Sequence, residues 1–167
     1  PFEGAHVVIQ GFGQVGMWVA KLAYERGCKV IGLSDVEGGI YNDNGLDIPK
    51  VISYRSQVGT VSGFNDSDHI SNDDLLEVVC DFLVPAAVNG TIHTGNANRI
   101  RANIIVEAAN HPVTAEADSI LTDKGVTILP DILVNAGGVI ASYFEWTQNL
   151  YQHQWDESRV NDELIKI

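Results

Sequence analysis

The chain has 167 residues, of which 45% are hydrophobic and 19% are charged, a composition typical of one folded domain with its own core. Its formal net charge of −12 argues against nucleic acid or anionic membranes as partners, because phosphate groups are bound by clustered Lys and Arg. No apolar run reaches the ~18 residues that a membrane span needs.

Short β-branched runs alternate with longer segments of helical spacing along the whole chain. In chain order the pattern predicts a strand over 6–10, a helix over 14–26, a strand over 29–34, helices over 47–58 and 71–78, a strand over 80–84, a helix over 95–101, a strand over 103–107, a helix over 114–124, a strand over 126–129, a long helix from between 131 and 136 to about 154, and an amphipathic helix over 157–167. The alternation predicts an α/β domain of the doubly wound Rossmann type, with a mainly parallel sheet and helices on both faces.

Two loop regions complete this prediction. The segment 38–47 is rich in turn residues, and its Asn44-Gly45 pair predicts a small hairpin before the next helix. Residues 59–69 are polar, and we expect them to be irregular. Cys28 and Cys80 lie beside apolar strand-like runs without a CxxC partner, so we expect buried, reduced thiols.

A glycine-rich turn follows the first predicted strand and opens the first predicted helix. It reads Gly11-Phe12-Gly13-Gln14-Val15-Gly16, and Asp35 ends the second strand 19 residues after Gly16. In this context GxGxxG predicts a dinucleotide site. The first glycine makes the turn, the second lets the pyrophosphate approach the backbone, and the third lets helix and strand pack closely. The helix N-terminus supplies free N–H groups to the phosphates.

Asp35 also bears on the choice of coenzyme. Its carboxylate can accept hydrogen bonds from both adenosine ribose hydroxyls, whereas a 2′-phosphate beside Asp35 and Glu37 would be repelled. Segment 34–38 supplies no Arg or Lys to hold such a phosphate. The sequence therefore favours NAD over NADP.

Three later segments also follow predicted strands, at the edge of the sheet where such folds bind ligands. Ala86 and Ala87 are small enough for a ligand to pass close to the backbone, and Asn110 offers an amide that both donates and accepts. Asn135 precedes the paired glycines 137–138, which destabilise a helix by ~1 kcal/mol each relative to Ala. A turn-forming role for Asn110 and a packing role for the glycines are the alternatives.

Other kinds of site find little support. The five histidines are scattered, with no HxxxH pair and no Cys partner at ligand spacing, so no metal site is expected. The sequence also lacks GxSxG and other nucleophile signatures.

Five segments of the chain resemble the coenzyme domain of the glutamate/leucine/phenylalanine/valine dehydrogenases. They are VVIQGFGQVG (7–16), GLSDVEGGIYNDNGLDI (32–48), FLVPAA (82–87), IVEAAN (105–110) and PDILVNAGGVIASYFEWTQN (130–149). The SYFEW ending is similar to the glutamate branch. The resemblance implies an NAD-dependent, reversible oxidative deamination of L-glutamate to 2-oxoglutarate and ammonia.

The resemblance also implies roles for particular residues. Cofactor-binding roles fall on Gly11, Phe12, Gly13, Gln14, Val15, Gly16, Asp35, Ala86, Ala87, Asn110 and Asn135. Ala86 and Ala87 would line the adenosine side, and the two asparagines would position the nicotinamide and its ribose. Val139 and Ser142 would face the substrate, with Ser142 donating to the glutamate side-chain carboxylate. His111 stands where relatives often carry a small residue such as Gly.

In this family the catalytic lysine and aspartate belong to an N-terminal domain that precedes the coenzyme domain. We therefore expect residues 1–167 to form only the coenzyme domain, to contain no catalytic residue and to be inactive alone. A leucine, phenylalanine or valine dehydrogenase and a non-catalytic NAD-sensing module are the alternatives. The resemblance further implies a homohexamer for the full-length protein, and a cytoplasmic location or, in a eukaryote, the mitochondrial matrix.

Overall fold

The computed structural model describes residues 2–167 and contains a seven-stranded sheet in the order β4-β3-β2-β1-β5-β6-β7. The strands are β1 (His6–Gln10), β2 (Lys29–Asp35), β3 (Gly38–Tyr41), β4 (Asp68–Ile70), β5 (Cys80–Pro85), β6 (Ala102–Val106) and β7 (Thr127–Leu129). The pairings β2-β1-β5-β6-β7 are all parallel, whereas β3 and β4 pair antiparallel at one side. The predicted α/β class and mainly parallel sheet are confirmed.

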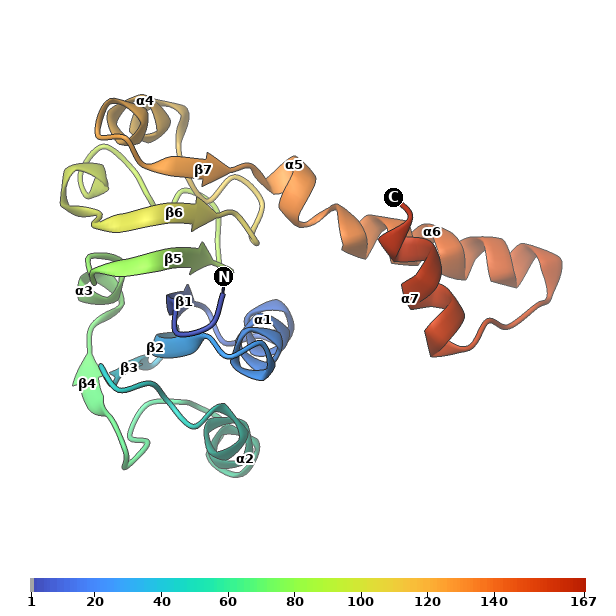
Figure 1. Ribbon diagram of the computed structural model, residues 1–167, viewed down its shortest axis with the longest axis horizontal. Coiled ribbons are helices and arrows are strands. Elements are labelled where there is room, and N and C mark those ends of the chain that lie inside the picture. Colours follow the sequence, from blue (N-terminus) through green and yellow to red (C-terminus); the bar gives the residue numbers. More distant parts are fainter. Residues whose placement is uncertain (1) are drawn as a thin grey trace.

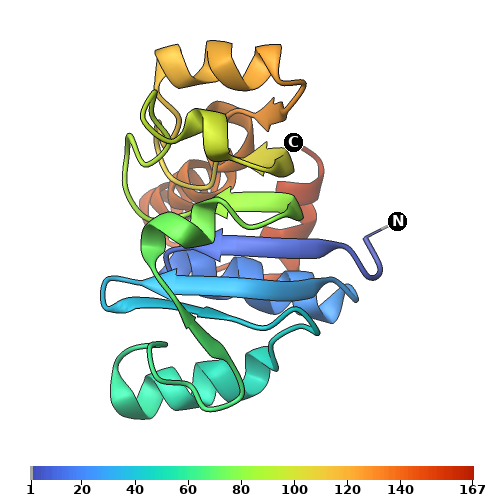
Figure 2. The same cartoon turned by 90° about the vertical axis from the view of Figure 1, so that its left-hand side faces the viewer.

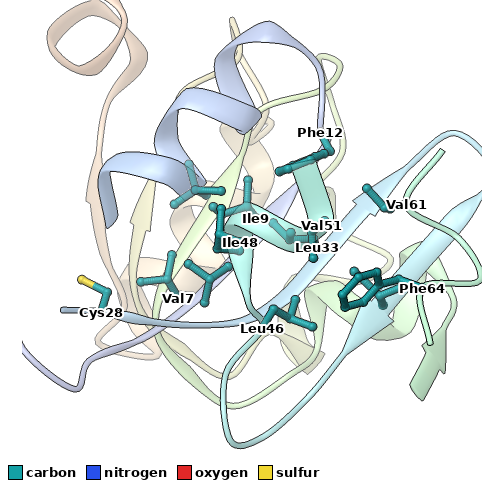
Figure 3. Close-up of a cluster of buried hydrophobic side chains, with 14 residues drawn as sticks. Val7, Ile9, Phe12, Cys28, Leu33, Leu46, Ile48, Val51, Val61 and Phe64 are labelled. Carbon is teal, nitrogen blue, oxygen red and sulfur yellow. The ribbon is translucent and has the colours of Figure 1, made fainter. Parts of the chain in front are cut away.

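Helices cover both faces of this sheet, because successive side chains of a strand point to opposite sides. Val7 and Ile9 of β1 belong to a core cluster with residues of α1 (Gln14–Glu25) and α2 (Ile48–Val58), part of which Figure 3 shows. Val8 belongs to a second cluster, with residues of α3 (Asn72–Leu76) and α4 (Ala115–Asp123). Figures 1 and 2 show the two layers of helices on either side of the strands.

Local capping explains where most helices begin. The side chains of Asp47, Ser71, Thr114 and Asp156 each accept a hydrogen bond from a backbone N–H in the first turn that follows. These groups satisfy donors that have no partner inside the helix. The helix starts that the sequence predicted at residues 47, 71 and 114 are confirmed to within one residue.

Four local predictions need correction. The hairpin is formed by β2 and β3, and its turn lies at residues 36–37 rather than at Asn44-Gly45. Segment 95–101 contains only the short 3₁₀ helix η1 (Ala97–Arg99), and the region expected to be irregular ends in β4. The long C-terminal helix is divided at Asn135 and ends at Tyr151.

The C-terminal helices extend away from the sheet. The short α5 (Asp131–Val134) leads into α6 (Ala136–Tyr151), and α7 (Glu157–Ile165) folds back beside α6 (Figure 1). Phe144 is the one buried residue of α6, and its ring lies 5.4 Å from that of Trp155. Within residues 2–167 no helix is long and apolar enough to cross a membrane.

Candidate functional site

The glycine turn lies at the point where the strand order of the sheet reverses. The chain leaves β1 toward β2, β3 and β4, and returns on the other side of β1 as β5. The N–H of Ala86 donates to the carbonyl of Gln10 at 2.8 Å, so the loops after β1 and β5 are joined at their start. This is the position at which open α/β sheets bind their ligands.

Gly11 and Gly16 are needed by the packing of this turn. Gly11 has φ +94°, and a Cβ there would lie 2.8 Å from the Cβ of Ala87. A Cβ at Gly16 would overlap the carbonyl oxygen of Gly11. These contacts agree with the turn-forming and close-packing roles expected for the first and third glycines.

Gly13 differs from these two glycines, because a Cβ at this position would meet no atom within 4 Å. Gly13 is the N-cap of α1, has an extended conformation, and carries no side chain that could cap the helix. Gln14 and Val15, the next two residues, are exposed. The first turn of α1 therefore faces open space with its N–H groups uncapped by any side chain of the described chain, which suits a phosphate.

A cleft of about 510 Å³ opens beside this turn. It is lined by Gln10–Gly13, Ser34–Val36, Arg55, Gly59, Asn72 and Ala86–Val88. Three buried side-chain atoms lack a hydrogen-bond partner in the part of the chain that the structure describes: Gln10 Oε1, Ser34 Oγ and Arg55 Nε. All three belong to residues that line this cleft. Because unsatisfied buried polar atoms are rare in folded proteins, their concentration here fits a polar ligand.

Asp35 lies in the cleft, but its carboxylate is already hydrogen-bonded. It accepts from the Thr60 hydroxyl at 2.8 and 3.0 Å, from the Val61 N–H at 2.7 Å and from the Glu37 N–H at 2.9 Å. Asp35 thus ties the β2–β3 turn to the loop after α2. A ribose would have to share an acceptor that also holds the wall of the cleft.

Arg55 is a residue of the cleft to which the sequence analysis assigned no role. It lies on α2, far in sequence from segment 34–38, yet it lines the same cleft as Asp35. Its guanidinium carbon lies 5.7 Å from the centre of the Phe12 ring. Phe12 itself is 1% exposed and belongs to a core cluster. The cleft therefore contains a cation that the local sequence around Asp35 did not reveal.

The two predicted asparagines form a separate pair, with Asn110 in the loop after β6 and Asn135 at the end of α5. The Asn135 side chain donates from Nδ2 to Asn110 Oδ1 at 2.8 Å. Neither residue lines the cleft around Asp35. His111, the residue after Asn110, has φ +46°, a left-handed conformation that favours glycine.

Val139 and Ser142 lie outside both groups, on α6. Val139 is 74% exposed, and the Ser142 hydroxyl donates to the Gly138 carbonyl of its own helix at 3.0 Å. Among residues 2–167 no three His, Cys, Asp or Glu side chains come together as a metal site.

Comparison with known proteins places the chain in a family. The sequence profile of the glutamate/leucine/phenylalanine/valine dehydrogenases matches residues 1–167. The chain belongs to this family. A glutamate dehydrogenase of Thermotoga maritima is 49% identical to it over 164 residues, which are 98% of this chain and 39% of that protein.

Solved structures of family members share the fold. The hetero-hexameric glutamate dehydrogenase of Thermus thermophilus matches with a TM-score of 0.91 at 33% identity, over 98% of this chain and 38% of its own. The glutamate dehydrogenase of Peptoniphilus asaccharolyticus matches with a TM-score of 0.77 at 34% identity, over 97% of this chain and 37% of its own. This family member therefore spans less than two-fifths of the length of these relatives.

Proposed function

We propose that this chain is the coenzyme-binding domain of an NAD-dependent glutamate dehydrogenase. In the whole enzyme it would serve the reversible oxidative deamination of L-glutamate to 2-oxoglutarate and ammonia. The observation that carries this proposal is the cleft at the strand switch point, with a glycine turn and an uncapped α1 beside it. The family match and the 49% identity to a glutamate dehydrogenase support the choice of reaction.

The coenzyme would lie along the carboxyl ends of the strands. Residues Gly11–Gly16 would bind the pyrophosphate through backbone N–H groups, which suits a chain with a net charge of −12 because the site needs no surplus of basic side chains. Asp35 would accept from the adenosine ribose, and Ala86 and Ala87 would line the adenosine side. The Asn110–Asn135 pair would hold the nicotinamide half, which accepts or returns the hydride.

Asp35 and Arg55 have opposing effects on coenzyme choice. The carboxylate repels a 2′-phosphate and the guanidinium attracts one, yet both line the cleft. Arg55 also lies over the Phe12 ring, whereas Asp35 ends β2 at the rim of the turn. Because the Asp35 carboxylate would repel a 2′-phosphate, we propose NAD as the preferred coenzyme, with NADP bound more weakly.

Substrate binding would require a second domain in addition to this chain. Val139 and Ser142 would contact L-glutamate only when a second domain closes over α6, because both are exposed here. Hydride transfer needs the reacting carbon about 3–3.5 Å from the nicotinamide, held by both walls of a cleft. We propose that the family's catalytic domain precedes this one, and that the chain alone binds NAD without turnover.

For the full-length protein we propose a homohexamer, in line with the hexameric Thermus thermophilus relative, although that assembly is a hetero-hexamer. The cytoplasm, or the mitochondrial matrix in a eukaryote, is the proposed compartment.

Calorimetric titration of this chain with NAD⁺, NADP⁺ and ADP-ribose tests the coenzyme proposal. We expect NAD⁺ to bind more tightly than NADP⁺, and equal affinities would contradict the argument from Asp35. The full-length protein, assayed with L-glutamate, L-leucine, L-phenylalanine and L-valine, tests the reaction. Preference for a branched or aromatic substrate would contradict a glutamate dehydrogenase, and NAD⁺ binding without turnover of any amino acid would favour a sensing module.

A further inference from the structure

Glu107 is a buried carboxylate to which the proposed function assigns no role. It directly follows β6 and is 7% exposed. Among residues 2–167 it is the only Asp, Glu, Lys, Arg or His that is buried. Burying a carboxylate destabilises a protein unless hydrogen bonds compensate for the lost water. The partners of Glu107 therefore indicate what it holds in place.

Both partners are backbone N–H groups in the segments that follow β6 and β7. Glu107 Oε2 accepts from the N–H of Asp131 at 2.9 Å, and Oε1 accepts from the N–H of Val113 at 3.3 Å. Asp131 opens α5, after β7, while Val113 ends the loop after β6. One buried side chain thus joins the two loops that carry Asn135 and Asn110.

Asp131 extends this connection. Its Oδ2 accepts from the N–H of His111 at 2.8 Å, and its Oδ1 accepts from the N–H of Ile132 at 2.7 Å. Its backbone carbonyl accepts from the N–H of Asn135 at 2.9 Å. Asp131 is therefore hydrogen-bonded to Asn135 and to His111, the residue that follows Asn110.

These bonds define the separation of the two amides. Asn110 lies in a loop held by Glu107 at Val113 and by Asp131 at His111. Asn135 lies at the end of α5, whose first residue is held by Glu107. The 2.8 Å hydrogen bond between Asn135 and Asn110 then closes the network. The strained φ of His111 is maintained where these bonds converge.

We propose that Glu107 and Asp131 are positioning residues for the nicotinamide half of the coenzyme site. This rests on the proposed function, because the asparagine pair is assigned to the nicotinamide there. The two carboxylates do not touch the coenzyme. They hold the Asn110–Asn135 pair in one geometry, and they act on the nicotinamide end without affecting the adenosine end at Asp35.

Saturation-transfer NMR of NAD⁺ with this chain separates the two ends, because adenine and nicotinamide protons resonate apart. The variants are Glu107→Gln and Asp131→Asn, with Asn110→Ala as the positive control. Glu116→Gln, at an exposed carboxylate in the first turn of α4, is the matched control. An amide oxygen can accept one of the two N–H bonds of Glu107 but presents a donor to the other, so one bond is lost.

We expect the ratio of nicotinamide to adenine saturation to fall about threefold in Glu107→Gln and Asp131→Asn, corresponding to one lost hydrogen bond. It should fall similarly in Asn110→Ala and stay unchanged in Glu116→Gln. The affinity for ADP-ribose, which lacks nicotinamide, should stay at the wild-type value. The conservative variant Glu107→Asp keeps a carboxylate, with two acceptor oxygens, and should retain more of the ratio than Glu107→Gln.

The possible failures are distinct. Absence of adenine saturation in the wild-type chain would contradict the proposed function itself. Normal adenine saturation with an unchanged ratio in both variants would overturn the positioning role alone. A proportional loss of both signals and of ADP-ribose binding would show a merely structural role and would also overturn it. If Glu107→Gln does not fold, as judged by circular dichroism, the result for Asp131→Asn tests the positioning role. This variant is more easily tolerated because Asp131 is less buried than Glu107.

Discussion

The carbonyl oxygen of Gly11 occupies the space that a Cβ of residue 16 would need. Gly16→Ala must therefore move α1 away from the turn, and we expect a loss of about 3 kcal/mol in the free energy of unfolding, or roughly 6–12 °C in Tm. Thermal unfolding followed by circular dichroism measures this.

Gly13→Ala is the matched change in the same turn. Because a Cβ there meets no atom within 4 Å, the free energy of unfolding should change by less than about 1 kcal/mol. The methyl group would project into the space assigned to the pyrophosphate, so NAD⁺ binding should weaken about tenfold in calorimetric titration. A Gly13→Ala chain that binds NAD⁺ normally would place the phosphates elsewhere.

Arg55→Gln tests the balance of charges in the cleft. Removal of the guanidinium should weaken NADP⁺ binding about tenfold, because the 2′-phosphate loses its cation, while NAD⁺ binding changes less than about twofold. Lys50→Gln, at an exposed residue of the same helix, provides the control. Equal weakening of both coenzymes would mean that Arg55 contacts a group that they share.

His111→Gly should stabilise the chain. At φ +46° a non-glycine residue is strained by about 1–2 kcal/mol, and the greater freedom of glycine in the unfolded chain offsets part of the gain. We expect a net increase of about 0.5–1 kcal/mol in urea denaturation. His111→Ala removes the same side chain but keeps the strain, so it should give no increase. A similar gain in both variants would assign the effect to the imidazole.

The thiols should be unreactive in the folded chain. Cys28 and Cys80 are buried and unpaired, and burial raises the pKa of the Cys80 thiol to about 12. A chromogenic disulfide reagent at neutral pH should react with both thiols after unfolding, and far more slowly before it. Because the folded pKa lies above the ordinary value of 9.0, stability contributed by Cys80 is present below pH 9 and is lost as the pH rises toward 12. Fast labelling of the native chain would contradict this burial.

The sequence predicted the elements whose signals are local. Strand β1 reads as a continuous apolar run because both of its faces are buried. The helix predicted over 47–58 begins where expected because the Asp47 side chain accepts from the N–H of Lys50. The hairpin turn was misplaced because Asn44-Gly45 is the stronger turn signal by composition. The turn at residues 36–37 is instead stabilised by Asp35, which accepts from the N–H of Glu37.

Long-range relationships were beyond the reach of local patterns. Strand β4 has three residues, and its place depends on pairing with β3 rather than on any periodicity of its own. The position of Arg55 in the same cleft as Asp35 depends on how α2 packs over the sheet. The links from Glu107 to Asp131 and Val113 join separate loops, so no spacing rule reveals them.

The two outermost strands, β4 and β7, have three residues each. Such short edges offer an incoming strand few backbone groups with which to pair, and this protects a sheet from growing by addition of further chains. We therefore expect this chain to resist fibril formation even at high concentration. Any self-association should arise instead from the exposed aromatic side chains of α6, and shortening the chain before Ala136 should abolish it.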